Sequence, residues 1–351
     1  FPAMIPCWMA AVAIACGNTF ILKPSEKDPS VPLRLGELLL EAGAPEGVLN
    51  VVNGDKVAVD AILTHPDVKA VSFVGSSDIA QYVYSTGTAH GKRVQAMGGA
   101  KNHGIIMPDC NMEQAVKDIV GAAYGSAGER CMALPVAVTV GKKTGDEFVE
   151  RMVDAARNLK VGISTDADAH YGPVVSAAHK AKVESYIQMG VDEGADLVLD
   201  GRGLKLQGNE NGYFIGPNLF DNVKPTMQSY KEEIFGPVLT VYLYDPSEWS
   251  KTIDLVDSTS PYGLTGCVIG QDKNAVSEAT ERLRHSAGNF YINDKPTGAV
   301  VGQQPFGGSR ASGTNDKAGS DLNLLRWVSI RTIKKTFDSP KDYRYPFLEK
   351  D

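Results

Sequence analysis

The sequence predicts an α/β protein built on a parallel sheet with crossover helices. From residue 19 onward, short runs rich in β-branched residues alternate with amphipathic stretches of helical length, a pattern typical of successive βα units. Of the 351 residues, 43% are hydrophobic and 22% charged, which is the composition of a folded protein and excludes disorder and collagen. This length favours two domains over one.

The strands are expected where β-rich runs lie between turn residues, at 19–22, 48–52, 70–74, 103–107, 136–140, 196–199, 239–244, 265–269 and 289–292. The helices are expected in the amphipathic stretches between these strands, at 31–42, 57–64, 79–88, 112–124, 146–158, 177–193, 249–258 and 275–283. A Gly-rich stretch at 97–100 is the best candidate for a domain boundary. The alternating run 328–337 is predicted to pair outside its own domain, and 338–351 to wrap the surface or fray.

The first 22 residues carry no charge. They lack the basic region of a signal peptide, and Pro2, Pro6 and Gly17 interrupt any membrane span. We therefore expect a buried alanine-rich helix at 10–15 that leads into the strand at 19–22. Because the chain starts without Met and in the middle of a pattern, we expect an opening piece to be missing.

Charge and cysteine usage exclude several classes of protein. The net charge is -7 with a pI near 5.5, so neither nucleic acid nor an anionic membrane is an expected partner. The five cysteines are scattered, with no CxxC pair and no Cys/His cluster at zinc spacing, which favours a reducing compartment and predicts no metal.

Two strand ends carry candidate ligand-binding residues. Lys23 and Glu26 follow the strand at 19–22, at the edge where open α/β sheets hold ligands. They suit the oxygens of a ribose or phosphate, although a solvated turn before a helix explains them equally well. Gly75 and Ser76 begin the helix after 70–74, where backbone N–H groups suit a pyrophosphate. There is no GxGxxG, so a standard Rossmann phosphate loop is not predicted.

Cys131 is the best candidate for a reactive residue. It ends the run Gly-Ser-Ala-Gly-Glu-Arg-Cys, with Arg130 beside it. A neighbouring guanidinium is predicted to lower the thiol pKa and favour the thiolate nucleophile; the alternative is a small buried hydrophobe. Further on, Glu233 and Phe235 precede a Gly-Pro turn, and 304–309 form a Gly-rich loop. Both segments suit a sugar edge and a flat ring, or simply shape turns.

Together these motifs resemble the aldehyde dehydrogenase superfamily over nearly the whole chain. They stand in the family's order: Phe1-Pro2 as the end of Pro-Trp-Asn-Phe-Pro, 23–26 as Lys-Pro-Ser-Glu, 74–76 as the Thr-Gly-Ser turn, 128–131 as the nucleophile motif, then 233–236 and 305–308. The resemblance implies an incomplete Rossmann-type, parallel-sheet NAD-binding domain at 1–99. It also implies an α/β catalytic domain at 100–311 and a C-terminal segment at 312–351 that includes an oligomerisation strand at 328–337.

The resemblance also assigns roles. It implies that Lys23 and Glu26 bind the adenosine ribose of NAD and that Gly75 and Ser76 lie near the pyrophosphate. Glu233 is then expected to bind the nicotinamide ribose, with Phe235 packed beside the nicotinamide. Cys131 is then the nucleophile. Its thiolate attacks the aldehyde, hydride passes to NAD, and a thioester remains on the enzyme.

One departure from the family pattern narrows the reaction. Most hydrolytic members have Leu-Glu-Leu-Gly-Gly-Lys, whose Glu activates water, whereas this chain has Val94 to Lys101 with Met97 or Ala96 at that position. Neither side chain is a general base. Water attack should therefore be slow, which leaves the thioester to a better nucleophile such as the thiol of coenzyme A.

Residues 95–96, 100–103 and 125–132 resemble the CoA-acylating branch that oxidises methylmalonate semialdehyde in valine and pyrimidine catabolism. In that branch the residue at Arg130 is implied to grip the substrate carboxylate, and a guanidinium binds a carboxylate bidentately. Tuning the thiolate, or a structural salt bridge, is the alternative for Arg130. The implied products are propionyl-CoA, or acetyl-CoA from malonate semialdehyde, with NADH and carbon dioxide.

Two other readings of the chain stay open: a hydrolytic aldehyde dehydrogenase of other specificity, and a catalytically incomplete fragment. The family implies a homo-oligomer, a dimer or tetramer, when the protein is full length. It implies the cytoplasm for a bacterial enzyme and the mitochondrial matrix for a eukaryotic one.

Overall fold

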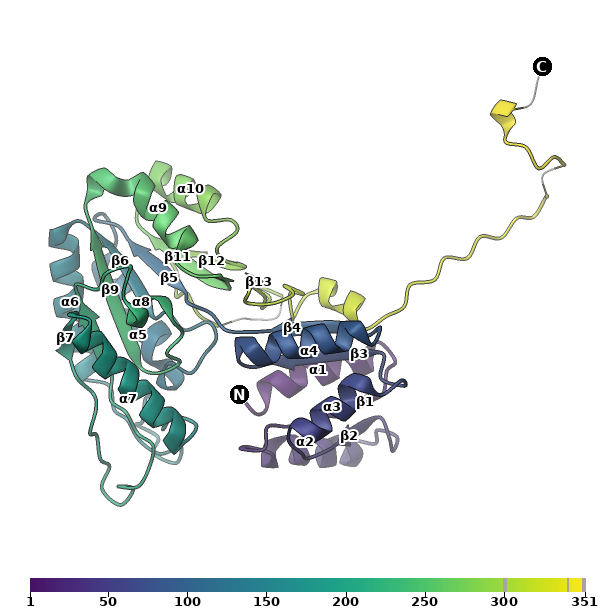
Figure 1. The fold of residues 1–351 in the computed structure, drawn as a ribbon, viewed down its shortest axis with the longest axis horizontal. Helices are drawn as coiled ribbons and strands as arrows, with labels where there is room; N and C mark the ends of the chain where they lie inside the picture. The colour runs from purple at the N-terminus through teal and green to yellow at the C-terminus, as the bar shows by residue number, and fades with distance from the viewer. Residues whose placement is uncertain (299–301, 340, 349–351) are drawn as a thin grey trace.

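A computed structural model describes residues 1–298, 302–339 and 341–348 and shows two lobes followed by a C-terminal extension (Figure 1). In the N-terminal lobe, helices and strands alternate: α1 Met4–Ala15, β1 Phe20–Leu22, α2 Ser30–Glu41, β2 Leu49–Val51, α3 Lys56–Thr64, β3 Ala70–Val74, α4 Ser77–Ala89 and β4 Arg93–Met97. The strands form two separate parallel pairs, β1 with β2 and β3 with β4. The expected parallel pairing is present, but these strands do not join into one sheet.

The larger lobe is built on a seven-stranded sheet in the order β12-β11-β5-β6-β9-β8-β7. Its strands are β5 His103–Ile106, β6 Val136–Val140, β7 Asp196–Leu199, β8 Asn218–Asp221, β9 Val238–Tyr244, β11 Thr265–Ile269 and β12 Asn289–Ile292. Every neighbouring pair is parallel except β7 with β8. Its helices are α5 Met112–Tyr124, α6 Lys142–Arg157, α7 Ala177–Asp192, α8 Gln228–Lys231, α9 Trp249–Ser258 and α10 Lys273–Arg282.

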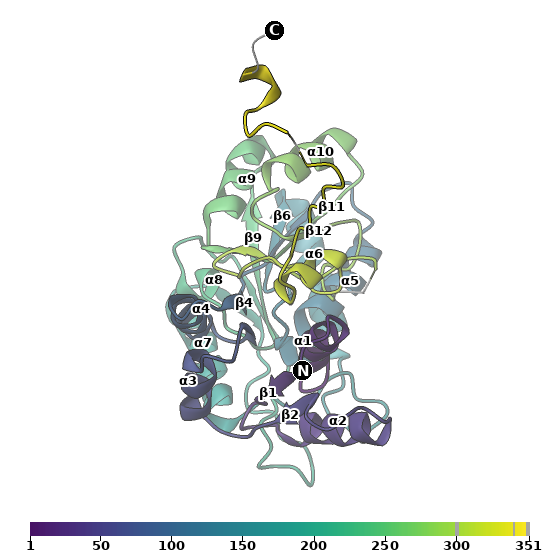
Figure 2. The same ribbon diagram turned by 90° about the vertical axis from the view of Figure 1, so that its right-hand side faces the viewer.

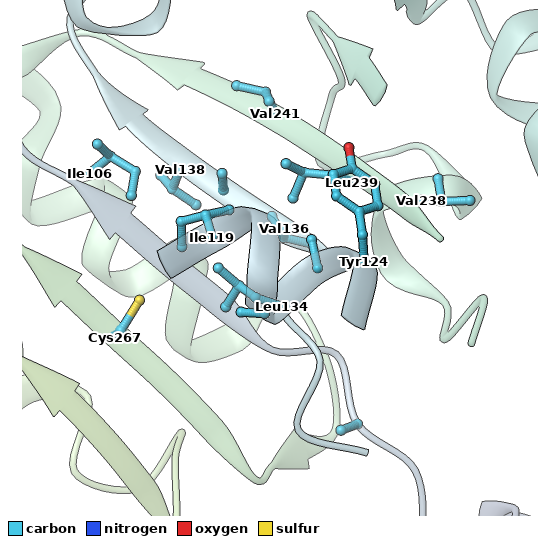
Figure 3. Close-up of a cluster of buried hydrophobic side chains, with 14 of the residues drawn as sticks. Ile106, Ile119, Tyr124, Leu134, Val136, Val138, Val238, Leu239, Val241 and Cys267 are labelled. Carbon is cyan, nitrogen blue, oxygen red and sulfur yellow. The ribbon is translucent and has the colours of Figure 1, made fainter. Parts of the chain in front are cut away.

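The centre of the large sheet is the core of the molecule (Figure 3). Val136, Val138 and Leu239 on β6 and β9 are fully buried, and Ile119 of α5 packs in the same cluster. Burial on both faces explains why these strands read as continuous apolar runs. Tyr124, the last residue of α5, donates a hydrogen bond from its hydroxyl to the Asn218 carbonyl at 3.1 Å, so the end of α5 is held firmly against β8.

The C-terminal segment crosses back over the N-terminal lobe. The Thr314 N–H donates to the Ala96 carbonyl at 3.0 Å, and the Gln95 side chain donates to Asn323 at 3.1 Å in the 3-10 helix η3, Asp321–Arg326. Residues 328–337 then run away from both lobes in an extended conformation (Figures 1 and 2). They pair with no strand among the described residues, so pairing with another subunit stays a prediction.

The predicted elements are largely confirmed. Each predicted strand is present within one residue, but the short strands β4, β8, β10 Tyr262–Gly263 and β13 Ser309–Arg310 were not predicted. Two helix starts were wrong by four or more residues, those of α4 and α10 by two, and the short helix α8 was not predicted. α1 begins at Met4 because Pro6 lies in the first turn, where its missing N–H costs nothing. α6 begins at Lys142 and contains Gly145. A glycine is needed there because a Cβ at this position would lie only 2.9 Å from the Thr139 hydroxyl.

The predicted division at 99/100 falls between β4, the last strand of the N-terminal lobe, and β5, the first of the large sheet; it stays a prediction. Over the described ranges, no helix combines the length and apolarity needed to cross a bilayer. Over the same ranges, no three His, Cys, Asp or Glu side chains gather as a metal site would require.

Candidate active site

The segment before Cys131 has an unusual backbone. Ser126, Ala127 and Gly128 in the 3-10 turn η1, Gly125–Gly128, all have positive φ, at 54°, 55° and 68°. The left-handed region costs a non-glycine residue about 1 kcal/mol, and such strain persists only where the surroundings fix the chain. Tyr124 fixes one side of this turn and Cys131 follows on the other, where it packs against the edge of the core.

Asn102, at the start of β5, anchors the backbone of the candidate nucleophile. Its amide donates to the Cys131 carbonyl at 2.9 Å and to the Ala133 carbonyl at 2.6 Å, while its oxygen accepts from the Thr265 N–H at 2.9 Å. The side chain is buried, and all three partners are backbone groups. The sequence offers no signal for this role, because Asn102 stands far from Cys131 along the chain.

Four predicted site residues come together. Arg130, Cys131, Glu233 and Phe235 line one pocket, whose wall also includes Asn102. They come from two segments, the turn after α5 and the loop before β9. This part of the site was predicted from sequence, and the structure brings its members into one place.

The expected effect of Arg130 on the thiol is wrong in this structure. Burial, with a smaller contribution from the charge of Glu233, raises the pKa of Cys131 to about 11. The Arg130 Nε donates instead to the Ser126 hydroxyl at 3.1 Å, and the guanidinium lies so close to Gly125 that a Cβ there would be 2.7 Å from it. The guanidinium therefore braces the turn, and the thiol is held protonated at neutral pH.

Glu233 is positioned by the link between the lobes. Its Oε1 accepts from the Ala100 N–H at 3.0 Å, and a Cβ on Gly99 would lie 2.4 Å from its Oε2, so only glycine fits there. Burial raises the pKa of Glu233, while the Ala100 N–H and the charge of Lys101 oppose the shift. Lys101 is itself buried and donates to the Glu232 carbonyl at 2.7 Å. Glu233 is thus a carboxylate in a fixed position beside the pocket.

Position 97, where the hydrolytic members carry their general base, holds a buried apolar side chain. Met97 and Ala96 are both buried at the end of β4. The Gly75 N–H donates to the Met97 carbonyl at 3.1 Å, and the Ala96 carbonyl accepts from Thr314 at 3.0 Å. Neither residue offers a group that could activate water.

The adenosine side of the predicted cofactor site lies in the N-terminal lobe. Lys23 follows β1, and its ammonium donates to the Gly54 carbonyl at 2.8 Å and to the Pro24 carbonyl, with the Glu26 carboxylate at 3.7 Å. Glu26 lies in an exposed turn and does not start a helix; α2 begins only at Ser30. Its carboxylate is exposed and, among the described residues, forms an ion pair only with Lys23, so it suits ribose hydroxyls.

Gly75 and Ser76 lie between β3 and the N-terminus of α4, as predicted. Ser76 is the N-cap residue, but its hydroxyl makes no capping bond to the helix. The next residue, Ser77, connects this turn to the pocket. Its hydroxyl lies 2.9 Å from the Tyr262 hydroxyl and accepts from the Gly99 N–H at 3.2 Å. Gly99 therefore lies between the phosphate-type turn and Glu233.

His179 and Glu129 contact the site but were not predicted. The His179 Nε2 lies 2.7 Å from the Phe235 carbonyl and 3.3 Å from Glu129 Oε1. Burial lowers the pKa of His179 and raises that of Glu129 to about 7. Glu129 precedes the nucleophile by two residues, but its partner His179 is remote in sequence, so no local motif could reveal the pair.

The fold and the pocket thus define an α/β protein with a cysteine and an arginine in one pocket, linked through Gly99 to the turn between β3 and α4. The model of the Aldehyde dehydrogenase family matches residues 1–333. The chain belongs to the aldehyde dehydrogenase family.

Similar proteins carry related names. A malonate-semialdehyde dehydrogenase of Pseudomonas aeruginosa is 50% identical over 89% of this chain and 62% of its own length. One from Halalkalibacterium halodurans is 56% identical over 84% of the chain and 59% of its own length. The chain therefore spans less than two thirds of these relatives.

Two solved structures share the fold closely. A methylmalonate-semialdehyde dehydrogenase from Oceanimonas doudoroffii has a TM-score of 0.91 at 47% identity, covering 97% of this chain and 69% of the other. A Sinorhizobium meliloti protein crystallised with NAD has the same TM-score at 48% identity, covering 97% and 68%.

Proposed function

We propose that the protein carries out the NAD-dependent, CoA-acylating oxidation of malonate or methylmalonate semialdehyde. The observation that carries the proposal is one pocket that holds a cysteine and an arginine. At the position where hydrolytic members keep a base, this chain has Met97 or Ala96, both of which are buried and outside the pocket lining. The names of the similar proteins support the same substrate class.

In the proposed reaction, the Cys131 sulfur loses its proton to solvent and attacks the aldehyde carbon, which forms a C–S bond and converts the carbonyl oxygen to an alkoxide. Bound NAD supplies the hydride acceptor, so that the alkoxide carbon becomes a thioester carbonyl on Cys131. Burial holds the pKa of the thiol near 11, and this favours a thiol that ionises only as substrate and cofactor arrive. Asn102 keeps the Cys131 backbone fixed during these steps.

Arg130 is proposed to bind the carboxylate of the substrate. It lines the same pocket as Cys131, and its Nε bond to Ser126 leaves the terminal nitrogens of the guanidinium for a ligand. A bidentate pair would orient the semialdehyde with its carbonyl toward the sulfur. An acyl group with a carboxylate in the β position loses carbon dioxide readily, and the carbon that held it takes a proton.

Coenzyme A is proposed as the acyl acceptor. Attack of its sulfur on the thioester transfers the acyl group and breaks the bond to Cys131. The Cys131 sulfur takes up the proton that coenzyme A loses, so the Cys131 thiol is restored and no water is consumed. Among the described residues lining the pocket, Glu233 alone carries a carboxylate. Its Oε1 already accepts from the Ala100 N–H, and we assign it to the nicotinamide ribose, so it is not free to activate water.

The residues proposed to hold NAD fit a dinucleotide by their chemistry. Glu26 offers an exposed carboxylate to ribose hydroxyls, with Lys23 beside it. The first turn of α4 offers backbone N–H groups and the unbonded Ser76 hydroxyl to a pyrophosphate. Phe235 lines the pocket together with Cys131, where a flat ring would pack.

Assembly and location extend the proposal. We expect a homo-oligomer, a dimer or tetramer, that uses 328–337, whose side chains Ile330, Ile333 and Phe337 are largely exposed in the single chain. For a bacterial source we expect the cytoplasm, and for a eukaryotic source the mitochondrial matrix.

Product analysis tests the proposal. The protein is incubated with malonate semialdehyde, NAD and coenzyme A, and the products are identified by mass spectrometry. The proposal predicts NADH with acetyl-CoA and carbon dioxide in equal amounts. Free malonate or acetate as the main product would instead support the hydrolytic alternative, and absence of any product would support the incomplete fragment.

A further inference from the structure

Three segments meet closely behind the pocket. They are the nucleophile loop 125–131, the start of α7, and the cofactor loop 233–237. A Cβ on Gly128 would lie 2.1 Å from the Gly236 carbonyl oxygen, and a Cβ on Gly236 would lie 2.7 Å from the Val183 side chain on α7. Only glycine allows this approach, so the three segments are packed with almost no free space between their backbones.

One side chain on α7 contacts both of the other segments and hydrogen-bonds one of them. The His179 Nε2 lies 2.7 Å from the Phe235 carbonyl oxygen in the cofactor loop and 3.3 Å from Glu129 Oε1 in the nucleophile loop. Both partners are acceptors, so Nε2 must carry the proton. The Phe235 bond is the shorter, and the two rings meet edge to face at 6.1 Å.

Both ends of this contact are themselves fixed. The His179 N–H donates to the Ser176 hydroxyl, the N-cap of the 16-residue helix α7. Glu129 Oε1 also accepts from the Val175 N–H at 3.1 Å. The side chains of His179 and Glu129 are each only 15% exposed. The histidine is therefore held by a long helix while its ring reaches both loops.

The bonded carbonyl belongs to a residue that needs support. Phe235 has φ +58°, a conformation that aromatic residues rarely adopt and that persists only where the surroundings impose it. A donor on its carbonyl is the kind of interaction that holds such a backbone in place. The close packing at Gly128 and Gly236 explains the position of the cofactor loop. The hydrogen bond from His179 explains why the backbone of Phe235 keeps its positive φ.

We propose that His179 is a positioning residue that fixes the cofactor loop 233–237, with Phe235, against the nucleophile loop that carries Cys131. The proposal rests on the proposed function and deepens it. It states that one hydrogen bond, from His179 to the Phe235 carbonyl, sets the distance between the Cys131 sulfur and the Phe235 ring that packs beside the nicotinamide. His179 touches neither reactant. Its effect passes through the Phe235 carbonyl and through Glu129.

The reactivity of Cys131 toward iodoacetamide measures this spacing without any catalytic turnover. If the loops separate, water and reagent reach the sulfur, and its pKa falls because burial is what raises it. Both changes speed alkylation. The remaining cysteines serve as internal standards, with Cys7 exposed and Cys267 buried in the core. Alkylation of each site is followed by peptide mass spectrometry.

The variants H179Q and H179N form a matched pair. A Gln amide nitrogen reaches the place of Nε2 and can donate to Phe235, whereas the shorter Asn cannot. We expect H179N to be alkylated at Cys131 about fivefold faster than the unsubstituted chain, the change expected for loss of one neutral hydrogen bond. H179Q should stay within about twofold. Cys7 and Cys267 should react as before.

Several results would overturn the proposal. Equal Cys131 rates in all three proteins would show that the bond does not hold the loop, and equal acceleration in both variants would assign the effect to ring packing. New reactivity of Cys267 in H179Q would mean that His179 serves the core. Where NADH formation is measurable, H179N should lower kcat and leave KM for the aldehyde unchanged. If the chain forms no NADH, the alkylation pattern still decides.

Discussion

The central strands of the large lobe are buried more completely than β1, β2 and β3 of the N-terminal lobe, whose remaining strand β4 is buried at four of its five positions. In the large lobe, every residue of β6 and of β11 is buried, whereas every residue of β3 in the N-terminal lobe is only half-buried, and Ile21 of β1 is exposed. The candidate nucleophile stands directly on the close-packed lobe. The residues proposed for the adenosine side of NAD stand on turns of the looser lobe. Geometry is thus fixed most firmly where bonds are proposed to form.

The largest expected effect is that of removing the candidate nucleophile from the large lobe. C131A should reduce NADH formation from malonate semialdehyde below detection, because no other group in the pocket can form the thioester. C110A is the matched control, since Cys110 is a half-buried thiol outside the pocket. Steady-state NADH absorbance measures both. Activity retained in C131A would remove the nucleophile from the account.

The next effect separates substrate binding from chemistry in the same lobe. R130L should raise KM for malonate semialdehyde roughly 10- to 100-fold, as expected for loss of a charged hydrogen-bonded pair worth about 1.5–3 kcal/mol. R130K keeps the positive charge but loses the two-pronged guanidinium geometry, so its KM should lie between those of the unsubstituted protein and R130L. Acetaldehyde, which has no carboxylate, serves as control. The assignment of Arg130 fails if the unsubstituted protein oxidises acetaldehyde as well as the semialdehyde.

A matched pair of asparagines compares the lobes directly. Asn102 donates to the Cys131 and Ala133 carbonyls while fully buried, and Asn18 donates to the Ala13 and Trp327 carbonyls at 3.0 Å each while exposed. We expect N102A to lower the free energy of unfolding by about 2–3 kcal/mol and N18A by about 1 kcal/mol. Urea unfolding measures both. Equal losses would contradict the contrast between the lobes.

The smallest expected effect concerns the thiol pKa. Because the pKa of Cys131 is raised to about 11 from its ordinary 9.0, the thiolate fraction, and with it the alkylation rate, should still be rising between pH 9 and 11. Burial is the first cause and Glu233 adds to it, so E233Q should lower the midpoint. R130L should leave the midpoint in place. A large rise in R130L would restore Arg130 as the group that tunes the thiol.

The same contrast explains what the sequence could predict. The strands that were predicted were found within one residue, because β-branched runs between turn residues have a simple local pattern. The strand β8 was missed because it follows a long Gly- and Asn-rich loop that masks the start of the β-rich run. β4 was missed because the Gly pair that follows it marked the segment as a boundary.

The sequence predicted several residues of the pocket correctly but did not predict the direction of the Cys131 pKa shift. Cys131, Arg130 and Glu233 were named from their motifs and line one pocket. Adjacency of Arg130 and Cys131 gave the wrong sign for the thiol pKa, since sequence shows neither burial nor the direction of a side chain. His179 and Asn102 reach the site only through tertiary packing, so no spacing in the chain could point to them.

The most direct test is the time course of NADH formation with and without coenzyme A, at protein concentrations high enough to see a single turnover. The account predicts one NADH per Cys131 and then a halt when coenzyme A is absent, with steady formation once it is added. Steady NADH formation at the same rate without coenzyme A would mean that water releases the acyl group, and the account would be wrong.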